Sequence, residues 1–181
     1  MRRTRVVEPL LSAALALVAL GAALVSQHRF DMQPCPWCVL QRLLFAVGAA
    51  LALLEATTLT LAGGRGDGDA WQSGDLHGQW PLAAPLLAGL RGLLAVCGLA
   101  AALWQHLVAA ASASCNLTLA DRVLAITRLD GLWPDVFQPR ASCLEAKAFL
   151  LGVPYEFWSG ALFILLAALA ARSALQTHRG T

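Results

Sequence analysis

The chain has 181 residues, of which 58% are hydrophobic and 13% are charged, and its mean hydropathy is +0.63. Soluble domains carry about 25% charged residues, so this composition indicates a protein that lies mostly within a membrane. The net charge of +2 is too small to indicate nucleic-acid binding, and no block rich in lysine and arginine supports it.

Four apolar runs are long enough to cross a bilayer, which takes about 20 residues. The expected spans, in chain order, are 9–26, 39–62, 92–111 and 153–171. Lipid admits only helices and closed barrels, so the pattern predicts an all-α integral membrane protein, a four-transmembrane-helix bundle in a single domain. We expect Arg91 near the edge of the third span. A cleaved signal peptide is the alternative for the first run, but it would leave an odd number of crossings.

Basic residues at the two ends of the chain predict its orientation. They are Arg2, Arg3 and Arg5 before the first span, and Arg172, His178 and Arg179 after the fourth. Because short cytoplasmic flanks are rich in arginine and lysine, we expect both termini in the cytoplasm. The loop 63–91, with a flexible glycine-rich part, is then cytoplasmic, and the loops 27–38 and 112–152 face the other side.

Cys35 and Cys38 form a Cys-Pro-Trp-Cys motif at the start of the second span. A disulfide across so short a gap adds little stability, so the motif is more often redox-active than structural. Pro36 is typical of a helix start. Cys38 would then lie in the first turn, where the positive end of the helix dipole stabilises a thiolate.

Arg42 follows Cys38 by four residues and therefore shares its helix face. A charged side chain at membrane depth is costly and usually marks a functional site. The alternative is an arginine that reaches back to the lipid headgroups. The spacing favours a site in which Arg42 stabilises a Cys38 thiolate.

Cys115 and Cys143 lie in the second outer loop, and Cys97 lies in the third span. Paired cysteines outside the cytoplasm indicate disulfides. Two alternatives stay open: a structural Cys115–Cys143 disulfide, worth about 2–4 kcal/mol, and a zinc site, which usually takes two close-spaced pairs. Haem attachment is excluded because Val39, not histidine, follows the motif. No metal is expected, and Cys97 is expected to be a buried packing residue.

Residues 119–128, between the two loop cysteines, are expected to form a short amphipathic helix on the membrane surface. Leu119, Val123 and Ile126 would share one face, with Asp121 and Arg128 opposite.

The run Cys-Pro-Trp-Cys-Val-Leu-Gln-Arg over residues 35–42 resembles the start of the second helix in the DsbB family of quinone-coupled disulfide oxidases. The four spans, the second cysteine pair and the segment 149–154 resemble that family too, so the likeness covers nearly the whole chain. It implies a quinone-dependent protein-disulfide oxidoreductase of the bacterial inner membrane. Such an enzyme reoxidises a periplasmic DsbA-like thiol oxidoreductase and supports disulfide formation in exported proteins.

The resemblance also implies roles for the cysteines. It implies the disulfides Cys35–Cys38 and Cys115–Cys143, with both outer loops periplasmic. The reduced partner would attack at Cys115, and electrons would pass to the first pair. Cys38 would then reduce a non-covalently bound ubiquinone or menaquinone.

Arg42 and His106 would contact the quinone by the same resemblance. Gln41 departs from the pattern, because many members carry glutamate there. A proton-handling role at that position is therefore in doubt.

Two competing functions remain. A vitamin K epoxide reductase-like enzyme uses similar chemistry, but its Cys-x-x-Cys motif comes late in the chain, whereas here it comes early. A non-catalytic assembly or metal-handling protein would use its cysteines structurally. It would keep its activity in an exported-disulfide assay after Cys38→Ser.

Overall fold

A computed structural model describes residues 2–64, 80–109, 119–146 and 148–178. Cys115 and residues 65–79 of the glycine-rich loop lie outside these ranges. The four long helices are α1 (Arg2–Phe30), α2 (Pro36–Gly64), α3 (Trp80–Trp104) and α7 (Tyr155–His178), and a five-residue π-helix, η1 (Gln105–Ala109), continues α3. All four are long and apolar enough to cross a membrane, which confirms the all-α four-helix prediction.

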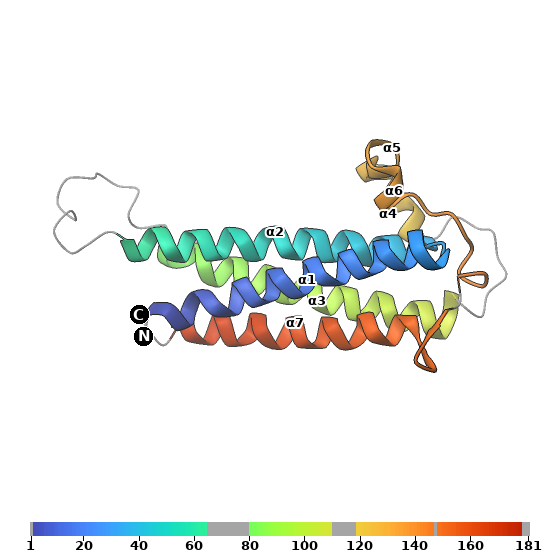
Figure 1. The fold of residues 1–181 in the computed structure, drawn as a ribbon. Helices are drawn as coiled ribbons and strands as arrows, with labels where there is room; N and C mark the ends of the chain where they lie inside the picture. The colour runs from blue at the N-terminus through green and yellow to red at the C-terminus, as the bar shows by residue number, and fades with distance from the viewer. Residues whose placement is uncertain (1, 65–79, 110–118, 147, 179–181) are drawn as a thin grey trace.

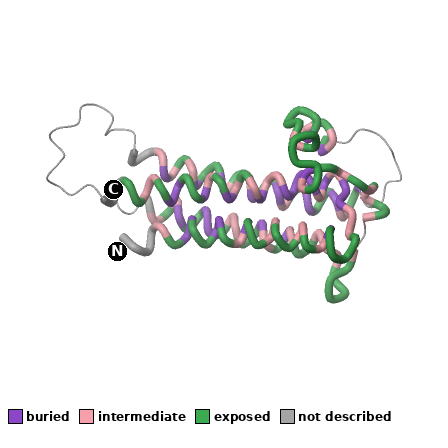
Figure 2. Tube along the Cα trace, turned by 45° about the horizontal axis from the view of Figure 1, so that its top comes forward, coloured by how far each residue is buried: buried purple, intermediate pink, exposed green. Residues whose placement is uncertain are grey.

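The four helices run side by side, and α1 begins at the end of the bundle where α7 ends (Figure 1). We call the opposite end, where α1 ends and α2 begins, the cysteine end. Buried residues form stripes on the inner faces of the helices, and exposed residues cover the outside (Figure 2). Many of the buried residues are alanines, and such small side chains let membrane helices pack closely.

The third span begins at Ala83 rather than at 92, which corrects the placement of Arg91 at its edge. Arg91 lies inside the bundle, and its Nε donates to Glu55 Oε2 at 2.7 Å. The hydroxyl of Ser173 donates to the other oxygen of Glu55. Because α2, α3 and α7 each supply one member of this group, the charge of Arg91 is neutralised within the protein.

The aromatic rings of Phe45 and Phe163 stack in the middle of the bundle, with centroids 4.2 Å apart and planes within 2°. Gly98 of α3 lies directly against the Phe163 ring, where a Cβ atom would overlap it. The glycine therefore permits the close approach of α3 and α7.

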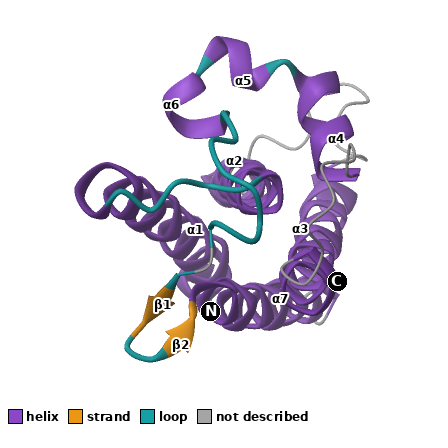
Figure 3. Ribbon diagram, turned by 90° about the vertical axis from the view of Figure 1, so that its right-hand side faces the viewer, coloured by secondary structure: helices purple, strands orange, loops and turns teal. Residues whose placement is uncertain are grey.

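Small elements cover the cysteine end. They are α4 (Leu119–Thr127), α5 (Leu129–Leu132), α6 (Pro134–Phe137), β1 (Phe149–Leu150) and β2 (Val153–Pro154). The three short helices form an arc beside α2, and the β1–β2 hairpin lies on the other side of the bundle (Figure 3). Since Val153 and Pro154 pair with β1, the fourth long helix begins at Tyr155 rather than at 153.

The short helix α4 forms as predicted, but a different face packs against the protein. Ala120 and Leu124 are buried, whereas Leu119 and Ile126 are exposed, Ile126 by 82%. Leu124 packs with Val39 of α2 and Phe137 of α6. The helix is therefore held by α2 and α6, and two of the three residues expected on its apolar face point outward.

Cys97 is exposed on the outside of α3, so the prediction of a buried packing residue is wrong. The helix is apolar on nearly every face, and its sequence does not reveal which face meets lipid.

Candidate active site

Hydrogen bonds fasten the second outer segment to the first at the cysteine end. The backbone N–H groups of Arg140 and Ala141 donate to the Pro34 carbonyl at 2.9 and 3.3 Å. Gln27 Nε2, at the end of α1, donates to the Asp135 carbonyl at 3.1 Å. These contacts hold the chain that leads to Cys143 beside the Cys-Pro-Trp-Cys motif.

The sulfur atoms of Cys38 and Cys143 consequently lie beside the sulfur of Cys35. Its Sγ lies 2.9 Å from the Sγ of Cys38 and accepts a hydrogen bond from the Cys38 backbone N–H at 3.4 Å. It also shares a hydrogen bond with the Cys143 thiol. Cys35 is fully buried, whereas Cys38 and Cys143 are partly exposed. Cys35 is therefore placed to exchange sulfur partners between its two neighbours.

Hydrogen bonds and burial shift the pKa values of Cys35 and Cys143 in opposite directions. The hydrogen bonds that Cys35 makes with Cys143 and Cys38, together with its burial, raise its pKa. The hydrogen bond from Cys35 lowers the pKa of Cys143, and the backbone N–H of Trp37 contributes in the same direction. The proton therefore resides on Cys35, and Cys143 is the more readily ionised thiol of the two.

Arg42 lies one helical turn below Cys38, as its spacing predicted, and its side chain is buried. The guanidinium donates to Gln27 Oε1 at 2.6 Å and to the backbone carbonyls of Val136 and Ala23 at 3.1 and 3.3 Å. No salt bridge among the described residues involves Arg42. These neutral acceptors fix a buried positive charge beside the sulfurs without cancelling it.

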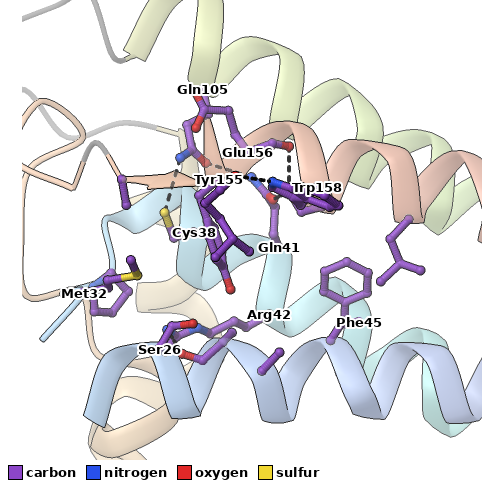
Figure 4. Close-up of a pocket in the computed structure, with 18 of the residues that line it drawn as sticks. Ser26, Met32, Cys38, Gln41, Arg42, Phe45, Gln105, Tyr155, Glu156 and Trp158 are labelled. Atoms are coloured by element: carbon purple, nitrogen blue, oxygen red, sulfur yellow. Dashed lines mark hydrogen bonds between the residues drawn. The ribbon is translucent and has the colours of Figure 1, made fainter. Parts of the chain in front are cut away.

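A cavity of about 470 Å³ opens between α1, α2 and α7 next to these groups. Cys38, Gln41, Arg42 and Gln105 meet at one end of it, whereas Phe45 lies farther along (Figure 4). Alanines of α1 and leucines of α7 line much of the remaining wall: Ala19, Ala22, Ala23, Leu162 and Leu165. The site thus joins a thiol and a fixed cation to an apolar chamber.

Residues 7–172 match the family model described as "Disulfide bond formation protein DsbB". The chain belongs to the DsbB family. Its relatives include "Disulfide bond formation protein B" of Ralstonia nicotianae, 29% identical over 87% of this chain and 86% of that protein. The protein of the same name from Aromatoleum aromaticum is 30% identical over 83% of this chain and 81% of its own length. No solved structure matches the chain.

Membership of the DsbB family makes this chain a multi-pass membrane protein of disulfide bond formation, and it supports a disulfide-forming oxidoreductase role. Cys35, Cys38 and Cys143 converge, while Cys115 lies outside the described residues. Both predicted disulfides, Cys35–Cys38 and Cys115–Cys143, remain predictions.

His106 stands beside the cavity rather than in its wall. Its Nδ1 pairs with Glu156 Oε1 at 2.8 Å, and its ring packs against Phe157 at 4.5 Å between centroids. Glu156 itself lines the cavity. A direct quinone contact of His106 remains a prediction.

Sequence reasoning missed several polar residues of this DsbB site. Gln27 anchors Arg42, Gln105 donates to Cys38 Sγ at 3.3 Å, and Ser159 donates to Gln41. Glutamine and serine carry no motif, so only a helical wheel with a known inward face could have found them. The sequence marks Gln41 only as a departure from the family pattern.

Proposed function

We propose that this DsbB family member reoxidises a DsbA-like periplasmic thiol oxidoreductase and passes the electrons to a membrane quinone. The observation that carries the proposal is a thiol, Cys38, in the wall of an apolar cavity beside the buried Arg42 cation. A DsbA-type partner has a potential near −120 mV, so reoxidising it requires a strong oxidant. Lipid-soluble quinones are such oxidants, and only a protein within the membrane reaches them.

The cavity residues fit a quinone headgroup. The volume of the cavity falls in the range of about 300–1,000 Å³ that is usual for small-molecule pockets. Such pockets combine apolar walls with a few polar groups. Arg42 offers a buried positive charge for a carbonyl oxygen, and small α1 side chains such as Ala19 and Ala23 leave room for a ring. When bound, the quinone supplies a two-electron acceptor that takes up two protons on reduction.

The sulfur arrangement supports an exchange between the two loops. We take Cys35–Cys38 as the starting disulfide. The partner's thiolate attacks the Cys115–Cys143 disulfide, bonds to Cys115 and releases the Cys143 thiolate. Cys143 then attacks Cys35, forming Cys35–Cys143 and releasing the Cys38 thiolate. Each step forms one S–S bond and breaks one, and the two electrons from the partner's dithiol arrive at Cys38.

The second half of the cycle restores the starting state. The partner's second thiol attacks its mixed disulfide and frees Cys115. Cys115 then attacks Cys143 of the Cys35–Cys143 disulfide, which reforms Cys115–Cys143 and releases Cys35 as a thiol. Cys38 gives up its electrons at the cavity and bonds again to Cys35, 2.9 Å away. Arg42 stabilises the anionic sulfur throughout, because its charge lies at the same end of the cavity.

This function requires the cysteine end to face the periplasm of the bacterial inner membrane, with both termini cytoplasmic. The arginines in the first turns of α1 and near the end of α7 support that orientation.

The test mixes the purified protein anaerobically with a reduced DsbA-like partner and a ubiquinone or menaquinone analogue, and follows quinone absorbance. We expect partner-dependent quinone loss, abolished by Cys38→Ser and slowed about a hundredfold or more by Arg42→Met, because electrostatic stabilisers commonly contribute that much. Cys97→Ala, on the outside of α3, is the matched cysteine control and keeps full activity.

Absence of partner-dependent quinone loss with both analogues would overturn the proposal. Full turnover in Cys38→Ser would show that electrons leave by another group.

A further inference from the structure

Beyond the cysteines and the arginine, we propose that Gln105 is a catalytic residue: its side-chain N–H holds the Cys38 sulfur as a thiolate, and Gln41 and Ser159 fix the direction of that N–H. The inference rests on the proposed function in one respect, namely that Cys38 is the sulfur that hands on electrons.

A line of hydrogen bonds joins three helical segments and ends on the reacting sulfur. The Ser159 hydroxyl of α7 donates to Gln41 Oε1 of α2. Gln41 Nε2 donates to Gln105 Oε1 at 2.8 Å, and Gln105 Nε2 donates to Cys38 Sγ at 3.3 Å. Figure 4 shows Gln105 above Cys38 with its nitrogen toward the sulfur. The hydrogen bond to Ser159 therefore fixes the orientation of the Gln41 amide, and Gln41 in turn fixes the orientation of the Gln105 amide.

The donor-to-acceptor direction of these hydrogen bonds decides whether the Gln105 N–H or its oxygen faces the Cys38 sulfur. Because Gln41 gives its N–H to Gln105 Oε1, that oxygen is occupied, and the Gln105 N–H is left to face the sulfur. The reverse orientation would place an amide oxygen against an anionic sulfur. Gln41 and Gln105 are both buried, where a hydrogen bond to a charged group is stronger than in water.

The backbone explains how Gln105 comes to lie there. Gln105 is the first residue of the π-helix η1, and it is one of the two buried residues of that helix. The i→i+5 pairing of a π-helix departs from regular α-helix geometry, and such turns occur frequently at functional sites. The irregular turn lies at the point where α3 reaches the sulfurs.

The test uses the full, reduced protein without quinone or partner. Cys38 alkylation by iodoacetamide is followed by peptide mass spectrometry across pH 6–10. We expect Gln105→Met, which matches glutamine in size but lacks the N–H, to slow Cys38 alkylation at pH 7 about tenfold or more. Gln41→Met should give a smaller loss in the same direction, because Gln105 remains but is no longer oriented.

The pH profile separates this role from a packing role. With less thiolate at neutral pH, the Gln105→Met deficit disappears at high pH, where the thiol is ionised in both proteins; a packing or access defect persists at every pH. The variant leaves in place the other titratable or charged groups around Cys38, which are Arg42 on α2, Cys35 and Cys143 in the outer segments, and Tyr155 and Glu156 on α7. Gln138→Met, at an exposed glutamine, is the matched control.

Unchanged Cys38 alkylation in Gln105→Met, or a deficit equal at every pH, overturns the inference. Neither result touches the proposed function, which is judged by quinone loss in the unaltered protein. Conversely, failure of quinone loss there leaves the alkylation result standing.

Discussion

Cys35 is the residue on which the site depends, because it touches the other two described thiols of the site, Cys38 and Cys143. Its burial and its hydrogen bonds hold its proton, while the same hydrogen bond stabilises the thiolate of Cys143. The proposed nucleophile, Cys143, and its proposed target sulfur, Cys35, thus lie in contact in the structure without any partner. In the fully reduced protein, Cys143 is the thiol whose pKa is lowered, and a lowered pKa favours the reactive thiolate.

A pH profile of Cys143 checks this assignment. In the reduced protein we expect the midpoint of Cys143 alkylation below the usual thiol pKa of about 8.5, because hydrogen bonds favour the thiolate. Removing the donor by Cys35→Ala raises the pKa of Cys143 and slows its alkylation at pH 7 about tenfold. Cys97→Ala serves as the control. An unchanged midpoint in Cys35→Ala would contradict the hydrogen-bond assignment.

Two contacts between long helices fix the packing of α3, one against α2 and one against α7. One is the buried pair of Glu55 and Arg91, with the Arg91 Nη2 only 2.6 Å from Glu55 Oε2. The other is the packing of Gly98 on the Phe163 ring. Both lie away from the sulfurs, and both bear on the position of α3, which leads directly into Gln105 of η1.

Replacing one partner of the Glu55–Arg91 ion pair should destabilise the bundle more than replacing both partners. Glu55→Leu leaves Arg91 buried without its partner, which costs about 3–5 kcal/mol, whereas the double variant with Arg91→Leu regains most of that loss. Unfolding in detergent micelles, followed by circular dichroism, measures both. Glu145→Leu, at an exposed glutamate, is the control. Equal losses in the single and double variants would show that the charge itself is unimportant.

Gly98→Ala tests the close approach of α3 and α7. The new methyl group would overlap the Phe163 ring, which is stacked on Phe45 and cannot easily move, so we expect a loss of about 1–3 kcal/mol. Gly89→Ala, in the same helix with open space around it, should be neutral or stabilising by up to about 1 kcal/mol. The same unfolding assay compares the two. Similar stabilities of both variants would refute the packing argument.

At the scale of the whole molecule, four spans place both chain termini at one end of the bundle and the cysteine end at the other (Figure 1). In the proposed function, this arrangement would keep the site of the periplasmic partner apart from the cytoplasmic termini, and the cavity lies between membrane-length helices.

Labelling in spheroplasts tests that orientation. After treatment of intact spheroplasts with a membrane-impermeant reductant, a membrane-impermeant maleimide should label Cys143, because the segment that carries it lies at the cysteine end. A cysteine introduced by Thr60→Cys near the other end of α2 should be labelled only after permeabilisation. Labelling of that position alone in intact spheroplasts would invert the topology and exclude the proposed partner.

The sequence by itself determined the number of spans, the redox motif and the place of Arg42 one turn from Cys38. These features follow from local rules, namely apolar length and the spacing of four residues along a helix. Only the tertiary structure decided that Cys143 lies beside Cys35, that Arg91 pairs with Glu55, and that Cys97 faces outward. Helices that are apolar on every side carry no sign of which face packs inward. The contacts that position Gln105 on Cys38 arise only when three helices meet.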